Sequence, residues 1–173
     1  MIDNIKVLIS EEQVNVRINE LARQISKDYE GKSVHLICIL KGSVFFSCDL
    51  AKRITIPVTM DFMSVSSYGD ERVSSGRVRI VKDSDESIQD KDVLIIEDII
   101  DSGRTLAYLK ELLSSRAPRS LNICTLLDKP ERRVTEVDVK YVGFEIPDEF
   151  VVGYGLDYQQ TLRNLPYVGV YLD

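Results

Sequence analysis

The sequence contains no tryptophan, one histidine and three cysteines among its 173 residues. Because His35 is the single histidine, metal sites built from several histidines are excluded, and its place in an apolar run favours a structural role. Cys38, Cys48 and Cys124 are an odd number at no metal-like spacing, and the first and last of them lie in apolar runs where burial is expected. This cysteine usage suits a reducing compartment, so we expect a cytoplasmic location.

Long apolar runs are missing as well. The longest, at residues 34–40 and 93–96, fall far short of the about 20 apolar residues of a membrane-spanning helix, so we expect no membrane association. The first ten residues carry an acid early and have no long apolar core, so we expect no secretory signal. The net charge of −6 argues weakly against a nucleic-acid partner, because such surfaces need clustered lysine and arginine, but it leaves room for a small phosphate ligand.

The rest of the composition is typical of a globular protein. Hydrophobic residues make up 44% of the chain and charged residues 29%, which excludes disordered and fibrous classes. The length of 173 residues is sufficient to bury a hydrophobic core. Because no internal repeat or linker is visible, one domain over residues 1–173 is expected.

Strands and helices alternate along the chain. A helix is predicted from Ser10, which forms a capping-box pattern with Gln13 ahead of an apolar stripe at helical spacing, and Gly31 ends it. The alternation predicts an α/β fold with a mainly parallel sheet flanked by helices. A polar stretch rich in serine and glycine, residues 66–77, predicts a loop on an antiparallel arm. Further helices are expected at residues 44–52 and 105–113, and strands at residues 34–40, 57–65, 78–82, 92–96, 122–127, 137–144, 150–154 and 167–172.

The most informative segment is VLIIEDIIDSGRTL at residues 93–106. A buried strand brings Glu97 and Asp98 to its carboxyl end, where ligands of parallel sheets bind. The run DSGRT then opens a helix, whose free N–H groups and positive dipole end favour phosphate, and Gly103 allows close approach of the backbone. Because carboxylates cannot bind phosphate directly, the acids indicate ligand hydroxyls or Mg²⁺ between them and the phosphate.

A plainer interpretation of this segment remains. Asp101 or Ser102 would then only cap the helix, and the two strand acids would be polar strand-end residues. Three acids, one glycine and the hydroxyls of Ser102 and Thr105 within one strand–loop–helix transition favour a ligand site over that interpretation.

The segment resembles the ribose-5-phosphate motif of the phosphoribosyltransferase family, in which two acids precede Asp-Ser/Thr-Gly-x-Thr. The resemblance implies a type I fold of that family, with a mobile antiparallel lid arm and a small base-binding hood. It also implies purine salvage by Mg²⁺-dependent transfer of a phosphoribosyl group from 5-phosphoribosyl 1-diphosphate to N9 of hypoxanthine or guanine. Four further stretches narrow the resemblance to the hypoxanthine–guanine branch: LKGS at 40–43, SSYG at 66–69, LDKPERR at 127–133 and FEIPDEFVVGYGLDYQQTLRNLPYVG at 144–169.

The resemblance assigns residues to the phosphoribose. It places Glu97 and Asp98 at the ribose hydroxyls, partly through Mg²⁺, and makes Asp101 the general base near N7 of the purine. Arg104 stands where a lysine is often found in the family. The residues expected to bind the 5′-phosphate are Ser102, Gly103, Arg104 and Thr105.

On the pyrophosphate side, the resemblance points to Lys41, Gly42 and Arg163, with Arg133 in support. An ordinary surface turn is the alternative for the Lys41–Gly42 pair, whose peptide is often cis in the family or switches on binding. The resemblance makes Asp157 a ligand of a second Mg²⁺ on this side and a neighbour of the purine.

The purine is expected to contact Lys129, Phe150 and Val151. A lysine ammonium has donors only, so Lys129 favours a carbonyl at C6 and disfavours the amino group of adenine. Phe150 is expected to stack on the base, and a place in a strand core is the alternative. Val151 is expected to contact the edge of the base through its backbone.

Ser67 and Tyr68 start the polar loop and are expected to belong to a lid that keeps water from the sugar donor. An ordinary hairpin loop is the alternative. Two other functions stay open: a regulatory protein of the same fold that senses the sugar donor and binds nucleic acid, and an enzyme that prefers xanthine or guanine. Since the family forms dimers and tetramers, we expect a homodimer or homotetramer.

Overall fold

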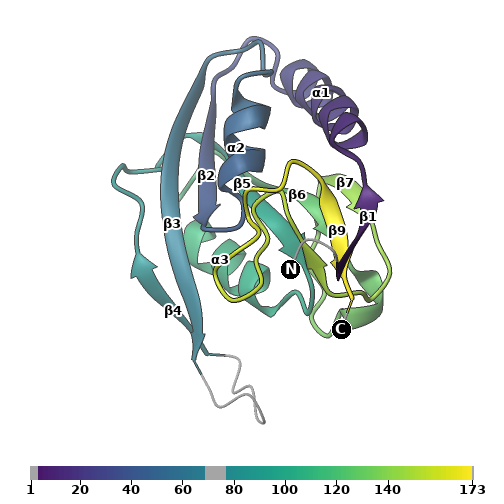
Figure 1. The fold of residues 1–173 in the computed structure, drawn as a ribbon. Coiled ribbons are helices and arrows are strands. Elements are labelled where there is room, and N and C mark those ends of the chain that lie inside the picture. Colours follow the sequence, from purple (N-terminus) through teal and green to yellow (C-terminus); the bar gives the residue numbers. More distant parts are fainter. Residues whose placement is uncertain (1–3, 69–76, 173) are drawn as a thin grey trace.

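The computed structural model describes residues 4–68 and 77–172, which form two β-sheets with three α-helices (Figure 1). The larger sheet has the strand order β4-β3-β2-β5-β6-β7, and the smaller has the order β1-β9-β8. In the larger sheet every neighbouring pair is parallel except β3 and β4. This arrangement confirms the predicted α/β fold with a mainly parallel sheet and one antiparallel arm.

The bounds of the elements are as follows. The larger sheet contains β2 (Val34–Leu40), β3 (Val58–Tyr68), β4 (Arg77–Lys82), β5 (Asp92–Ile100), β6 (Ser120–Asp128) and β7 (Tyr141–Glu145). The helices are α1 (Glu11–Asp28), α2 (Val44–Ala51) and α3 (Arg104–Ser114), and a 3₁₀ turn, η2 (Pro130–Arg132), follows β6. The smaller sheet, which we call the hood, contains β1 (Ile5–Ile9), β8 (Val151–Val152) and β9 (Val168–Tyr171).

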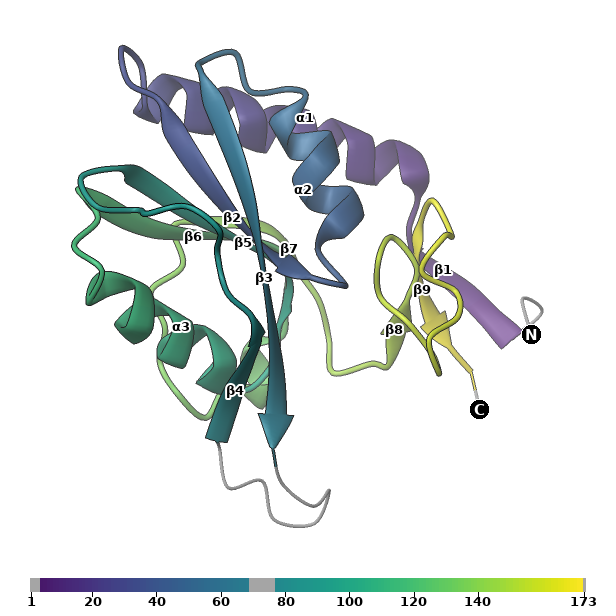
Figure 2. The same cartoon turned by 90° about the vertical axis from the view of Figure 1, so that its left-hand side faces the viewer.

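Helices cover both faces of the larger sheet. Figure 2 shows α1 and α2 on one face and α3 on the other. Side chains of successive strand residues point to opposite faces, so β2 and β5 supply apolar residues to a core on each side, which explains their continuous apolar runs. Within the described ranges, no helix combines the length and apolar character needed to cross a membrane.

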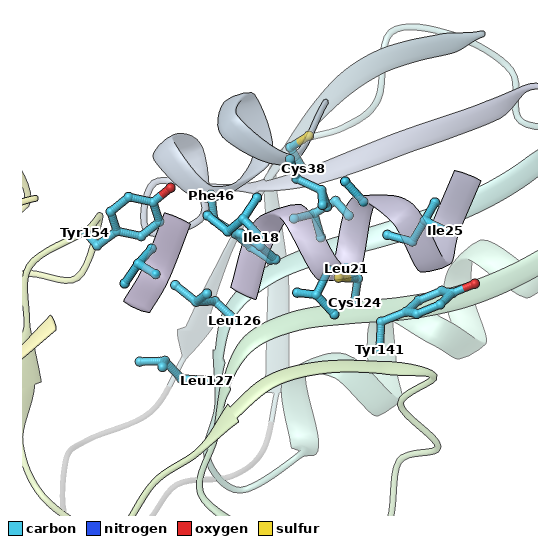
Figure 3. Close-up of a cluster of buried hydrophobic side chains, with 14 of the residues drawn as sticks. Ile18, Leu21, Ile25, Cys38, Phe46, Cys124, Leu126, Leu127, Tyr141 and Tyr154 are labelled. Atoms are coloured by element: carbon cyan, nitrogen blue, oxygen red, sulfur yellow. The ribbon is translucent and has the colours of Figure 1, made fainter. Parts of the chain in front are cut away.

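The core under α1 and α2 contains Ile18, Leu21 and Phe46 together with two cysteines (Figure 3). Cys38 and Cys124 are fully buried there, as predicted. Burial raises the pKa of the Cys38 thiol to about 12, so this cysteine acts as a small apolar side chain.

The start of α1 confirms the predicted capping box. The Ser10 side chain accepts the N–H of Gln13 at 3.2 Å, and the Gln13 side chain accepts the N–H of Ser10 at 2.8 Å. The strand β1 just before it was not predicted. It pairs with β9 from the far end of the described chain, and its run of mostly β-branched and apolar residues, IKVLI, is a local signal that could have predicted it.

Several of the predicted strands have other bounds in the structure. The strand predicted at 92–96 continues to Ile100, because parallel pairing with β6 extends to Ile100 and Asp128. The strand predicted at 137–144 begins only at Tyr141. Val137 and Val139 pack against the core beneath α3 from an unpaired segment, which accounts for their strand-like alternation. The strand predicted at 150–154 is reduced to β8.

The arm formed by β3 and β4 is longer than predicted. The strand predicted to end at residue 65 continues to Tyr68, which pairs with Arg77. Ser67 and Tyr68 are therefore strand residues at the end of the arm rather than the start of a loop. The rest of the predicted lid loop, residues 69–76, lies outside the described residues.

Candidate active site

A pocket of about 220 Å³ lies where β5 passes into α3. The first N–H groups of α3 have no acceptor within the helix, so this end carries a partial positive charge. The structure thus brings the strand-end acids and the start of the helix into one pocket, as the sequence indicated. Its lining residues are Glu97, Asp98, Ile99, Ile100, Asp101, Ser102, Gly103, Thr105 and Leu106.

Gly103 occupies the position before the helix, with a φ of 81° that favours glycine. A Cβ added there would meet the carbonyl oxygen of Thr135 at 2.3 Å and the Cδ of Arg133 at 2.9 Å. The glycine therefore serves two requirements at once, the left-handed backbone and close packing against the segment after β6. The loop of residues 101–105, which we call the phosphate loop, depends on both.

Glu97 and Asp98 are adjacent carboxylates near the end of β5. Glu97 is only 8% exposed. Burial is the main cause that raises the pKa of both carboxyls, and the charge of Asp98 raises the pKa of Glu97 further. Asp98 accepts the N–H of Ile99 at 2.8 Å. The charge of Arg163 opposes the rise in the pKa of Asp98. Two adjacent carboxylates at a strand end suit a ligand that brings a further cation or hydroxyl donors to them.

The loop after β2 lies against these acids. A Cβ on Gly42 would meet Asp98 Oδ2 at 1.6 Å, and a Cβ on Gly155 would meet the Gly42 carbonyl oxygen at 1.9 Å. Glycine at both positions lets the loop contact β5 on one side and, on the other, residues 153–167 between β8 and β9, which we call the hood segment. A cis peptide bond is present between Leu40 and Lys41, one residue before the Lys41–Gly42 peptide singled out from the sequence.

The hood segment brings Asp157 and Arg163 towards Lys41. The Arg163 guanidinium pairs with Asp157 Oδ1 at 2.7 Å and donates to the Gly155 carbonyl oxygen at 2.7 Å. Gln160 links this pair to the loop after β2, because its Oε1 atom accepts from Lys41 Nζ at 3.1 Å and from Arg163 at 3.4 Å. The residues predicted for pyrophosphate from two distant segments are therefore neighbours.

Lys129 follows β6 and is 5% exposed, which is unusual for a lysine. Its Nζ atom lies 3.7 Å from Asp101 Oδ1 and 3.9 Å from Asp148 Oδ1. Its backbone N–H donates to the Ile100 carbonyl oxygen at 3.0 Å, which fixes the start of this loop beside the end of β5. The structure thus places the ammonium next to the proposed general base.

Phe150 is 54% exposed and lies at the edge of the hood. Its ring meets Tyr158 and Tyr171 edge-on, with centroid separations of 6.0 and 6.4 Å, and those two tyrosines stack on each other at 4.5 Å. Exposure argues against the strand-core alternative, since the edge contacts leave a face of the ring available. Val151 is buried and pairs with Val170 of β9.

Arg133 is placed differently from the expectation. It was assigned in support of the pyrophosphate side, but its guanidinium forms an ion pair with Asp128 and donates to the Asp101 carbonyl oxygen at 3.2 Å. The Asp101 carbonyl belongs to the phosphate loop, and Asp128 pairs with Ile100 just before that loop. The reason is the turn η2, which reverses the chain after Lys129 and returns Arg133 to β5.

In the described part of the chain, no three His, Cys, Asp or Glu side chains form a group suited to a metal ion. Magnesium is usually held by one or two carboxylates together with substrate phosphates and water. Glu97 and Asp98 fit that donor set because they are adjacent carboxylates, of which Glu97 is buried and Asp98 lies against Gly42. The Asp157 carboxylate is already engaged by Arg163 and by the Gln160 N–H at 2.8 Å.

Residues 9–159 match the model of the phosphoribosyl transferase domain. The chain belongs to the phosphoribosyltransferase family. The resemblance inferred from the sequence motifs is thereby confirmed, and the pocket at the end of β5 coincides with the segment that carried it.

Individual phosphoribosyltransferases are similar over nearly the whole chain. Hypoxanthine phosphoribosyltransferase of Salmonella typhimurium is 53% identical over 167 residues, covering 95% of this chain and 94% of the relative. A crystal structure of hypoxanthine phosphoribosyltransferase from Staphylococcus aureus has a TM-score of 0.95 at 52% identity, covering 99% of this chain and 94% of the other. The bifunctional protein TilS/HprT of Listeria monocytogenes is 53% identical over 165 residues, and the match spans only 26% of its length.

Two side chains of this phosphoribosyltransferase site were not singled out from the sequence. Gln160 links the two cations of the pyrophosphate side, and Asp148 is a second carboxylate beside Lys129. Both lie inside the matching stretch 144–169, but neither is part of a pattern with a chemical requirement of its own. Only the spatial contact with Lys41 and Lys129 identifies them.

Proposed function

We propose that the protein is a purine-salvage enzyme that transfers the 5-phosphoribosyl group from 5-phosphoribosyl 1-diphosphate to N9 of hypoxanthine, and also of guanine, with release of pyrophosphate. The observation that carries the proposal is the buried Lys129 beside the pocket at the end of β5, which we call the phosphate pocket. Lys129 adds a hydrogen-bond donor for the O6 atom of a 6-oxopurine to a site suited to phosphoribose. The names of the similar proteins from Salmonella and Staphylococcus support the same reaction.

The phosphoribose half of the donor would be bound at the end of β5. Ser102, Gly103, Arg104 and Thr105 would bind the 5′-phosphate through N–H and hydroxyl donors at the positive end of α3. Glu97 and Asp98 would accept hydrogen bonds from the ribose hydroxyls, since two adjacent carboxylates suit a vicinal diol.

Mg²⁺ is the cofactor that fits this donor set. Glu97 and Asp98 would hold one ion with the substrate oxygens, and Asp157 a second one on the pyrophosphate side. When bound, the metal would neutralise negative charge on the leaving pyrophosphate. Lys41 and Arg163 would supply further positive charge there, and Gly42 would let the loop approach closely.

The chemistry at the base is a proton transfer coupled to bond exchange. N9 of the purine attacks C1 of the ribose, and the bond from C1 to the pyrophosphate oxygen breaks with inversion. Asp101 would accept a proton from the purine at N7, and Lys129 would donate to O6 as charge develops on the ring. Phe150 would stack on the purine, and Val151 would contact its edge through the backbone.

Several properties of the whole protein belong to the same proposal. Ser67 and Tyr68 end the arm from which a lid could cover the site and exclude water. One phosphoribosyltransferase domain would span residues 1–173. A homodimer or homotetramer in the cytoplasm, without membrane or nucleic-acid partners, is the setting we propose.

The test is a spectrophotometric assay with 5-phosphoribosyl 1-diphosphate and Mg²⁺ against hypoxanthine, guanine, xanthine and adenine in parallel. We expect turnover with hypoxanthine or guanine and none with adenine, because Lys129 cannot accept from an amino group. Turnover of adenine would overturn the role of Lys129. A folded protein that binds the sugar donor but turns over no base would overturn the enzyme proposal and favour a regulatory one.

A further inference from the structure

Arg133 contacts the outer side of the phosphate loop. Its side chain is 13% exposed, it is paired with Asp128, and its Nε atom donates to the Asp101 carbonyl oxygen at 3.2 Å. The Cδ of the same side chain packs against Gly103, where a Cβ would come within 2.9 Å of it. One arginine thus touches both ends of the turn that connects β5 to α3.

The backbone of the following residues continues this contact. The Ser102 carbonyl oxygen accepts the N–H groups of Val134 and Thr135, each at 3.0 Å. Two successive carbonyls of the phosphate loop are therefore held on one side by the segment after η2. The same loop residues line the pocket.

These hydrogen bonds also fix the direction of the N–H groups that follow the bonded carbonyls. In a trans peptide the C=O and the following N–H point in opposite directions. Holding the Asp101 carbonyl outwards therefore turns the Ser102 N–H away from Arg133, and holding the Ser102 carbonyl outwards does the same for the Gly103 N–H. Both N–H groups then point away from the bonded carbonyls and, because both residues line the pocket, are available to an anion there.

We propose that Arg133 is a positioning residue for 5′-phosphate binding, which acts through the Asp101 carbonyl and is itself oriented by Asp128. This inference rests on the proposed function and assigns a role to a side chain that need not touch any substrate. It differs from the assignment of Arg133 to the pyrophosphate side. When Arg133 is replaced, a positioning role predicts weaker binding of the nucleotide, whereas the pyrophosphate assignment predicts weaker binding of pyrophosphate. The guanidinium fork is required because one nitrogen binds Asp128 while another binds the carbonyl.

The experiment is calorimetric titration of the full chain and of Arg133→Met and Arg133→Lys with inosine 5′-monophosphate, and separately with Mg²⁺ and pyrophosphate. For Arg133→Met we expect the dissociation constant of the nucleotide to rise about tenfold and that of pyrophosphate to stay within about twofold. Arg133→Lys keeps the charge but lacks the two guanidinium nitrogens that bind Asp128 and the carbonyl at once. We therefore expect the dissociation constant of the nucleotide to rise about threefold.

Arg116→Met is the matched control. Arg116 forms a similar ion pair with Asp83, with a nitrogen–oxygen distance of 2.7 Å, and neither residue lines the pocket. It should lower the melting temperature without changing either dissociation constant. Arg133 is overturned as a positioning residue if the pyrophosphate constant rises instead, if neither constant changes, or if both rise equally as the melting temperature falls. Failure of the unmodified protein to bind the nucleotide would overturn the proposed function as well.

Discussion

The site has two parts that are constructed in different ways. One is the phosphate pocket at the end of β5, and the other, which we call the hood side, is where the hood segment meets the loop after β2. The pocket is lined by one continuous stretch between Glu97 and Leu106, and its loop carbonyls are bonded to the segment after η2. The hood side joins the loop after β2 to the hood segment through the side chains of Lys41 and Gln160, and the hood segment has backbone hydrogen bonds of its own. It also contains four non-glycine residues with positive φ, namely Tyr154, Gln159, Gln160 and Leu162.

This difference separates a preformed part from an adaptable part. Backbone hydrogen bonds to a strand end and a helix start fix the pocket before any ligand arrives. On the hood side, Gln160 accepts from one donor each of Lys41 and Arg163, the two cations proposed for pyrophosphate, so these side-chain contacts can rearrange when that ligand binds. A left-handed backbone at a non-glycine residue costs about 1–3 kcal/mol of free energy, so the contacts of the hood segment have to compensate for this strain.

The largest expected effect is at Asp101, which belongs to the phosphate loop and is proposed to accept the proton of the base. Asp101→Asn should lower turnover about 100-fold or more, because the general base is lost, while the KM for the sugar donor changes little. Steady-state kinetics with hypoxanthine measure both quantities. Asp148→Asn is the matched control, since its carboxylate lies 3.9 Å from Lys129, close to the 3.7 Å of Asp101, and a loss of similar size there would remove Asp101 from the base role.

Gly103→Ala should damage the preformed pocket itself. The added Cβ meets the Thr135 carbonyl and the φ of 81° becomes strained, so we expect the free energy of unfolding to fall by about 2–4 kcal/mol. Nucleotide affinity should fall with it. Gly31→Ala has a similar φ of 77° but nothing within 4 Å, and should cost only about 1 kcal/mol in chemical denaturation. Equal losses would show that packing at Gly103 is unimportant.

Phe150→Leu should affect the hood side alone. Loss of stacking should raise the KM for hypoxanthine about tenfold, whereas ribose 5-phosphate should bind as before. Because the ring is 54% exposed, the melting temperature should change little. A matching loss of ribose 5-phosphate affinity would contradict the separation of the two parts.

The smallest effect concerns His35, at the opposite end of β2 from the site. The ring is 2% exposed, its Nδ1 lies 2.7 Å from Thr59 Oγ1, and within the described residues its Nε2 has no partner. Burial, and then Lys91, lowers the pKa of His35, while Asp61 and Glu86 oppose this. Its contribution to stability is therefore present above about pH 6.5 and lost as the pH falls through that value, because only the unfolded chain takes up the proton readily.

Urea denaturation at pH 7.5 and pH 5.5 measures this effect. We expect the unmodified protein to lose more stability between the two values than His35→Gln, which cannot titrate. An equal loss in both would assign the acid sensitivity to other groups.

The contrast between the two parts also explains how far the sequence could be interpreted. The phosphate pocket was predictable because strand, acids, glycine and helix start follow one another in residues 93–106. The α/β order was predictable from alternation for the same local reason. The contacts of Gln160 and Arg133 could not be predicted. They depend on where the hood segment and the turn η2 are placed against the larger sheet, which the local sequence does not indicate. For β1, the run IKVLI indicates a strand, whereas its pairing with β9 could not be predicted from local sequence.

The pairing of β1 with β9 has a consequence for the order of folding. Ile5 pairs with Tyr171, so nearly the whole described chain must be arranged before the hood can close, and contacts of such large sequence separation form late. The parallel pairing of β5 with β6 needs only one helical crossover. Amide hydrogens of β9 should therefore exchange with solvent sooner than those of β5, since the hood can open while the phosphate pocket stays intact.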